Sequence, residues 1–164
     1  MRHLILFRHG KAELARPGED DHDRALAPRG WDDAPLVAKA LIAKGLAPDT
    51  AYISTARRCR ETWAAITEIF MQAAPSETED LYLAAPRTIL EIADASDGDC
   101  MLIVGHNPGL QDLSVSLAPM GDQRAAAMRT RFPTSAASVF SRESDDAPWR
   151  FVDFIVAKDL RAPE

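Results

Sequence analysis

The sequence predicts an α/β protein, a three-layer sandwich in which a mostly parallel central sheet with an antiparallel edge lies between helices. Short apolar runs alternate with segments of helical periodicity through most of the chain, which is typical of α/β layer structures. The last two apolar runs, 137–140 and 151–156, are separated only by the polar turn 142–148, which favours an antiparallel edge pair. A length of 164 residues suits one domain, so we expect a single domain over residues 1–164.

The first third of the chain supplies two of the predicted strands. Residues 4–7 form a short apolar run that predicts a buried strand, and the polar residues 14–24 predict a surface loop. Apolar residues at helical spacing predict a helix over 31–44, which Gly45 ends. A second short strand is predicted over 51–54.

The rest of the chain continues the alternation. Apolar side chains on one stripe predict a helix over 58–72, and residues 81–83 predict a short strand. A proline suits the first position of the helix predicted over 86–95. The continuous apolar run 100–104 predicts the most distinct strand, and 110–117 has helical spacing.

Composition limits the partners of the protein. There are 19 Lys and Arg residues against 25 Asp and Glu residues, and this net charge of -6 argues against nucleic acid, because phosphate contacts need a basic face. A local basic cluster could still bind a small anion. No apolar run approaches the roughly 20 residues of a membrane-spanning helix. The apolar start of the chain is too short for a signal peptide, so we expect a cytoplasmic protein without a membrane partner.

The cysteines do not predict a metal site. Cys59 and Cys100 lie far apart and lack histidines at metal-ligand spacing, which argues against zinc. The acidic residues at 20, 21 and 23 are interpreted as a solvated loop rather than a metal site. We expect two free thiols, as in a reducing compartment, and no metal.

Cationic residues follow three of the predicted strands at the point where each strand ends. Arg8-His9-Gly10 follows the first strand, three arginines lie between 57 and 60 after the second, and His106 follows the strand 100–104. The carboxyl ends of parallel strands meet at one edge of a sheet, where ligands of open α/β sheets bind. We therefore expect two histidines and at least two arginines to face one pocket.

Phosphoryl transfer is the chemistry that uses such a set. The planar guanidinium of arginine matches the oxygens of a phosphate, and two arginines can neutralise a dianion and its transition state. A neutral imidazole is a competent nucleophile when its proton sits on the other ring nitrogen. A second, protonated histidine can bind a phosphate oxygen, and nearby helix N-termini can add N–H donors.

Three segments in this order resemble the motifs of the histidine phosphatase superfamily, the phosphoglycerate-mutase-like group. Arg8-His9-Gly10 is similar to its first signature, and the run from Ser54 to Thr62, with an arginine four residues after the serine, is similar to its second motif. Gly105-His106-Asn107-Pro108 resembles its third. The resemblance extends from residue 4 to about 117. The short chain and the Gly-His-Asn-Pro form are most similar to the SixA-type branch of small phosphohistidine phosphatases.

The resemblance implies roles for four residues. His9 would be the nucleophile that takes the phosphoryl group, Arg8 and Arg58 would bind the phosphate, and His106 would bind and stabilise the transferring group. Arg58 is selected by the motif spacing over its two neighbouring arginines. The resemblance implies a phosphoglycerate-mutase-like fold and no cofactor.

Two departures from the family pattern concern acid chemistry. Lys11 stands where the family often has an acidic residue, and the glutamate that usually serves as the acid has no clean match. Four carboxyl groups stay open as weak candidates for a general acid: Glu79, Asp80, Asp21 and Asp23.

Other residues of these types have ordinary structural interpretations. His3 and His22 are expected to be structural or solvated, and Cys59 is expected to be a buried helix residue rather than an activated thiol. Trp63 and Phe70 are expected in the core.

The sequence therefore predicts a cofactor-independent phosphatase that works through a phosphohistidine intermediate, with phosphohistidine in proteins as the favoured substrate. Two alternatives stay open. The same chemistry could serve a small phosphomonoester such as a sugar phosphate or nucleotide, or the chain could be a phospho-ligand binding module without turnover. The sequence leaves the physiological partner and the oligomeric state undecided.

Overall fold

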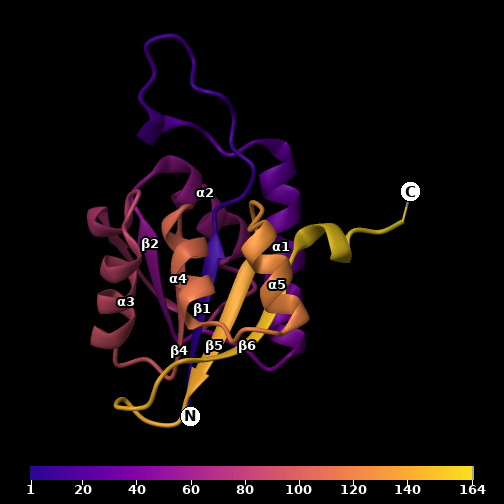
Figure 1. The fold of residues 1–164 in the computed structure, drawn as a ribbon. Helices are drawn as coiled ribbons and strands as arrows, with labels where there is room; N and C mark the ends of the chain where they lie inside the picture. Colours follow the sequence, from indigo (N-terminus) through magenta and orange to yellow (C-terminus); the bar gives the residue numbers. More distant parts are fainter. Residues whose placement is uncertain (164) are drawn as a thin grey trace.

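Six strands form one mixed sheet with helices against both faces in the computed structural model, which describes residues 1–163 (Figure 1). The strands are β1 (Arg2–Arg8), β2 (Thr50–Ser54), β3 (Ala74–Thr78), β4 (Cys100–Gly105), β5 (Ala137–Arg142) and β6 (Arg150–Ile155). The helices are α1 (Pro28–Ala43), α2 (Arg57–Ile66), α3 (Pro86–Ala95), α4 (Gly109–Leu117) and α5 (Gln123–Thr130). Three short 3-10 turns are η1 (Asp21–Asp23), η2 (Glu79–Leu81) and η3 (Ala157–Leu160).

The sheet has the order β3-β2-β4-β1-β5-β6. The first four strands in this order are parallel, whereas β5 pairs antiparallel with both β1 and β6. The predicted fold class, a mostly parallel sheet with an antiparallel edge between layers of helices, is confirmed. The order places β2, β4 and β1 side by side, so the segments that follow these three strands emerge at one edge of the sheet.

Strand β1 shows how the sequence builds the two faces. Successive side chains of a strand point to opposite faces, and both faces of this strand are fully buried. Leu4 and Leu6 pack in the core cluster that includes side chains of α3 and α4, whereas Ile5 and Phe7 pack in the cluster that includes α1 and α2. A strand buried on both faces has no polar alternation, which is why residues 4–7 form a continuous apolar run.

Two sequence predictions in the middle of the chain are wrong. Helix α2 ends at Ile66 rather than at 72, because the chain then makes a series of turns that bring it back to β3. The strand predicted over 81–83 does not form: Leu81 ends η2, and Leu83 has a positive φ of 49°, which a strand cannot contain. The actual strand, β3, lies a few residues earlier on the sheet edge and is mostly exposed.

Helix α5 has no counterpart among the predicted elements. Its sequence, QRAAAMRT, has no stripe of large apolar side chains, and only Ala125 and Met128 are buried. The chain after β6 is also ordered by contacts, because η3 is followed by an ion pair between Arg161 and the buried Asp33 of α1. None of the helices within residues 1–163 combines the length and the apolar character needed to cross a membrane.

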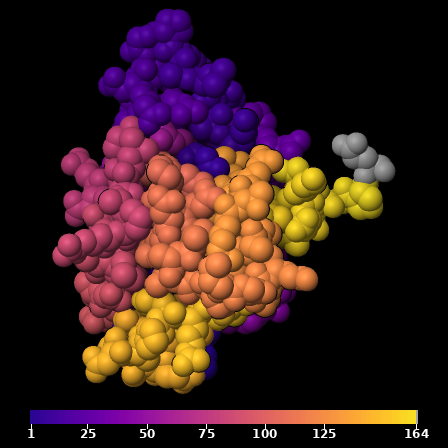
Figure 2. All heavy atoms as spheres, viewed as in Figure 1, coloured from indigo at the N-terminus to yellow at the C-terminus, as the bar shows by residue number. Residues whose placement is uncertain are grey.

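The segment between β1 and α1 rises above the edge of the sheet where the parallel strands end (Figure 1). In the space-filling view it forms an indigo lobe that projects from the rest of the molecule (Figure 2). A short antiparallel bridge between Ala12 and Leu26 closes its base. The bridge thus holds the two ends of this loop together, between the end of β1 and the start of α1.

Candidate active site

The three cationic segments predicted from the sequence meet at the carboxyl edge of the sheet. His9 follows β1 and His106 follows β4, and their ring centroids lie 5.3 Å apart. Arg58 reaches both from the first turn of α2. A cavity of about 400 Å³ lies in front of these groups. Its lining comprises Arg8, His9, Lys11, Ala12, Asp21, Arg24, Arg58, Leu83, His106, Asn107 and Thr134.

Backbone contacts fix the orientation and the tautomer of His9. Its main-chain N–H donates to the carbonyl of Gly105 at 3.1 Å, and its Nδ1 lies 2.7 Å from the carbonyl oxygen of Gly10. A carbonyl can only accept, so the proton sits on Nδ1 and Nε2 carries a lone pair. The Nε of Arg58 donates to this lone pair at 3.3 Å, which shows that Nε2 faces the cavity.

The His9 ring is uncharged at neutral pH. Only 8% of the residue is exposed, and this burial, assisted by the charges of neighbouring groups including Arg58, lowers the pKa of His9 to about 3. A neutral imidazole keeps its lone pair free from protons and available to an electrophile.

Gly10 allows α1 to approach the segment that follows β1 closely. A Cβ at this position would lie 2.8 Å from the Cα of Gly30, in the first turn of α1. The N–H of Gly10 donates to the hydroxyl of Thr62 at 2.9 Å, and that hydroxyl donates to the carbonyl of Arg58 at 2.6 Å. The glycine and the threonine of the first two motifs therefore tie β1 to α2.

Arg58 presents two edges of its guanidinium to different partners. Along one edge, Nε donates to His9 at 3.3 Å and Nη2 to Nδ1 of His106 at 3.2 Å, which are long hydrogen bonds. Along the other edge, Nη1 donates to the carbonyl of Asp21 at 2.8 Å and Nη2 to its carboxylate at 3.0 Å. Asp21 thus holds the outer edge and leaves the edge between the two histidines available to a ligand.

His106 is also neutral. Because Arg58 donates to Nδ1, the ring proton sits on Nε2 and donates to the hydroxyl of Ser54 at 2.8 Å. Burial and the charge of Arg58 lower the pKa of His106 to about 3. The sulfur of Cys59 lies 3.5 Å from the same Nε2, but burial raises the pKa of this thiol to about 12, so it is not a thiolate.

Arg8 completes the cationic side of the cavity. Its Nη1 donates to the carbonyl of Phe132 at 2.8 Å, while its Nε is buried and has no hydrogen-bond partner within residues 1–163. Burial, with Arg131 and Arg58 nearby, lowers the pKa of Arg8, although an arginine stays charged at neutral pH. Because Arg8 lines the cavity and stays charged, its guanidinium is a candidate binding group for an anion.

Asp21, His22 and Tyr82 form a cluster beside the site that the sequence did not predict. The hydroxyl of Tyr82 donates to the carboxylate of Asp21 at 2.6 Å, and its ring contacts His22 and His106 edge-on, with centroids 4.9 and 5.4 Å apart. His22, expected to be structural or solvated, lies 2.9 Å from the hydroxyl of Thr55. No spacing pattern links Tyr82 to Asp21 and His22, because the two neighbours belong to η1 whereas Tyr82 follows η2 about 60 residues later.

Of the four carboxyl groups considered as acids, the structure brings one to the cavity. Asp21 lines it, whereas Asp23, Glu79 and Asp80 do not. Hydrogen bonds from Tyr82, Arg24 and Arg58 lower the pKa of Asp21 well below its ordinary value. An ionised carboxylate with three donors around it is poorly suited to give a proton.

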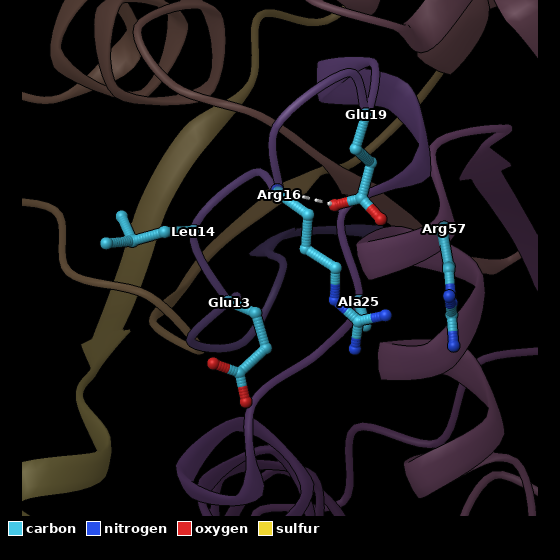
Figure 3. Close-up of a pocket in the computed structure, with 6 residues that line it drawn as sticks. All are labelled: Glu13, Leu14, Arg16, Glu19, Ala25 and Arg57. Carbon is cyan, nitrogen blue, oxygen red and sulfur yellow. Dashed lines mark hydrogen bonds between the residues drawn. The ribbon is translucent and has the colours of Figure 1, made fainter.

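The remaining arginines of the second motif lie outside the site. Arg57 and Arg60 are exposed, and Arg57 pairs with Glu61 at 3.0 Å. Arg57 borders a separate cavity of about 300 Å³ beneath the projecting loop, beside Arg16 and Glu19 (Figure 3). That cavity mixes acidic and basic groups and contains no histidine or cysteine. No group of metal-binding side chains is found in the part of the chain that the structure describes.

Comparisons with known proteins show the family of this chain. Residues 4–82 match the model of the histidine phosphatase superfamily (branch 1). An uncharacterized protein of Mycobacterium leprae is 38% identical over 142 residues, which cover 82% of this chain and 86% of that protein. The chain belongs to the histidine phosphatase superfamily.

Solved structures show which branch of the superfamily the chain resembles. A candidate phosphohistidine phosphatase SixA from Agrobacterium tumefaciens is 31% identical, with a TM-score of 0.82 over 94% of this chain and 97% of that one. A protein histidine phosphatase SixA in complex with tungstate shares the fold at 18% identity, with a TM-score of 0.81 over 97% and 99% of the two chains. The chain is of the SixA type, and its family and fold support phosphatase activity.

Proposed function

We propose that this protein is a cofactor-independent phosphatase that forms a phosphohistidine intermediate on Nε2 of His9. The observation that carries the proposal is the 2.7 Å hydrogen bond between Nδ1 of His9 and the carbonyl of Gly10. It fixes the proton on Nδ1 and presents an unprotonated Nε2 to a cavity lined by cationic groups. A nucleophile held in this way needs no separate base.

The phosphate site lies between the two histidines. A phosphate there would replace the long contacts of Arg58 with two charge-assisted bonds, from Nε and from Nη2. The guanidinium of Arg8, which lines the same cavity, supplies a further positive charge. His106 would contribute Nδ1 as a donor once the dianion raises its pKa and the ring takes up a proton.

The reaction then proceeds in two displacements. The lone pair of Nε2 of His9 forms a bond to phosphorus as the bond to the leaving atom breaks and its electron pair stays with that atom. In the second step, a water oxygen forms the new bond to phosphorus, the P–N bond to His9 breaks, and the proton of the water passes to solvent. Arg8, Arg58 and His106 stabilise the phosphoryl oxygens in both transition states.

Phosphohistidine in proteins is the substrate class that this site suits best. An alkoxide is a poor leaving group that needs a proton, and the one carboxyl group among the described residues that line the cavity is Asp21, whose pKa is held low. An imidazole has an ordinary pKa of about 6.5 and can leave neutral when it arrives protonated. A cavity of about 400 Å³ beside a projecting loop is compatible with a side chain presented by another protein. A phenolic or small phosphomonoester is the alternative substrate.

The experiment is a rapid-quench comparison of the wild type with His9→Ala. A radioactively labelled phosphohistidine domain, p-nitrophenyl phosphate and a sugar phosphate serve as substrates, and trapped label is mapped by mass spectrometry. We expect label on His9, none in the variant, and the highest catalytic efficiency on the phosphohistidine domain. Label on another residue would refute the intermediate. A higher efficiency on the sugar phosphate would refute the substrate class, and phosphoprotein binding without phosphate release would favour a binding module.

The same proposal includes the organisation of the whole chain. All described strands lie in one sheet, and on this basis we propose a single histidine phosphatase domain. The cytoplasmic location stays a prediction from the sequence.

A further inference from the structure

Among the residues that the structure describes, Asp21 is the one carboxylate on the wall of the cavity, and it has unused capacity to accept a hydrogen bond. Its Oδ2 accepts from Arg58 at 3.0 Å and from the hydroxyl of Tyr82 at 2.6 Å, while Oδ1 accepts from Arg24 at 2.9 Å. A carboxylate can accept about four hydrogen bonds, so one lone pair of Oδ1 stays available. The side chain is 45% exposed and can be reached from the cavity.

Asp21 and the expected phosphate position lie on opposite edges of the Arg58 guanidinium. The edge that faces His9 and His106 is the one that would bind phosphate, and Asp21 holds the opposite edge. A phosphate can therefore bind without displacing this carboxylate. In an in-line displacement the leaving group departs on the side of phosphorus away from the nucleophile. Asp21 lines the same cavity from the other edge of Arg58, so a leaving group that departs into the cavity has this carboxylate on its wall.

The charge of Asp21 decides which leaving groups it can help. Arg24, Arg58 and Tyr82 all donate to it and keep it ionised, and His22 packs against the Tyr82 ring on the same side. An ionised carboxylate cannot protonate an alkoxide and repels one. It can accept a hydrogen bond from a leaving group that already carries an N–H.

We propose that Asp21 selects phosphoramidate over phosphate-ester substrates by accepting a hydrogen bond from the N–H of a protonated leaving imidazole. This inference rests on the proposed function and names the residue that determines its substrate class. In the substrate, one imidazole nitrogen bears the phosphoryl group and the other bears a proton. The carboxylate stabilises this protonated form.

The step balances without a proton from the enzyme. The lone pair of Nε2 of His9 forms the new P–N bond, and the P–N bond of the substrate breaks with its electron pair returning to the leaving nitrogen. The positive charge of the imidazolium is thereby neutralised, and a neutral imidazole leaves with its N–H intact. Asp21 is ionised before and after the step.

The experiment compares two substrates in three proteins. Phosphoimidazole provides a P–N bond, and p-nitrophenyl phosphate provides a P–O bond whose leaving group needs no proton. Asp21→Asn keeps the size of the side chain and removes its charge. Asp23→Asn is the matched control, because it removes the same charge from the same 3-10 turn outside the cavity.

We expect Asp21→Asn to lower kcat/KM on phosphoimidazole by about 10- to 100-fold, the range for losing a charge-assisted hydrogen bond. The loss on p-nitrophenyl phosphate, which reports the contact of Asp21 with Arg58, should be clearly smaller, so that the ratio of the two kcat/KM values falls. Asp23→Asn should alter neither value. Equal losses on both substrates would show that Asp21 only positions Arg58, and would overturn the inference. An unchanged kcat/KM of Asp21→Asn on phosphoimidazole would overturn it as well.

A second measurement uses the wild type alone and does not depend on the variant folding. The pH profile of kcat reports groups in the enzyme–substrate complex. On phosphoimidazole, kcat should fall as the pH rises, with a midpoint above the pKa of the free substrate, because Asp21 favours the protonated form. A midpoint at or below that pKa would refute the inference. Wild-type turnover of p-nitrophenyl phosphate with none of phosphoimidazole would instead refute the proposed substrate class, and this inference with it.

Discussion

Arg58 offers the sharpest test of the site geometry, because three arginines compete for one role within four residues. Arg58 is 3% exposed and extends its inner edge between His9 and His106, whereas Arg57 is exposed and paired with Glu61. Arg58→Ala removes two donors that would meet the phosphoryl oxygens. Losing one preorganised donor to a developing charge costs about 2.7–4 kcal/mol.

The expected loss for Arg58→Ala is about 10²–10³-fold in kcat, since Arg8 remains and water can replace part of the second donor. Arg58→Lys should recover only part of this loss, because an ammonium cannot match two oxygens while it also holds Asp21 along a second edge. Arg57→Ala should stay within about 2-fold of the wild type, as expected for an exposed ion pair.

The assay is steady-state turnover of p-nitrophenyl phosphate, together with inhibition by tungstate as an oxyanion probe. Thermal melting of each variant checks the fold, since Arg58 also anchors the loop that carries Asp21. Equal losses for Arg57→Ala and Arg58→Ala in well-folded proteins would refute the assignment of the phosphate edge. So would a full recovery of kcat by Arg58→Lys.

Three further outcomes are expected. His9→Ala should melt close to the wild type but release no phosphate and trap no label; measurable turnover would contradict the nucleophile. His9 and His106 have a pKa of about 3 in the folded chain and about 6.5 when unfolded, so the unfolded chain binds more protons between these values. Stability should therefore be full above pH about 6.5 and decrease towards pH 3 in urea unfolding, less steeply in His9→Ala; equal slopes would contradict burial of the neutral ring. Gly10→Ala should lower the melting temperature and kcat because a Cβ meets Gly30 at 2.8 Å, whereas Gly105→Ala, whose nearest contacts are 3.8 Å away, should melt like the wild type; the reverse order would refute the packing.

The parts of the fold that the sequence predicts are those where burial leaves a pattern. Strands β1 and β4 are covered on both faces, so their residues are continuously apolar and their positions can be recognised. Strand β3 is held on the sheet edge by backbone pairing with β2 while its side chains are largely exposed, and its sequence therefore carries no such signal. Helix α5 was missed because only two of its eight residues are buried.

Some residues of the site could be predicted from the sequence and others could not. His9, Arg58 and His106 could be predicted because each follows a parallel strand, and parallel strands end at one edge. Asp21 and Tyr82 meet only after the loops that carry them fold over Arg58, 37 and 24 residues away in the sequence, and no local pattern encodes that contact. The groups that would bind the phosphoryl oxygens thus lie beside the sheet, and the carboxylate that would meet the leaving group lies on a surface loop. Because loops change more freely than buried strands, we expect substitutions at Asp21 to alter substrate preference more than they alter phosphate binding.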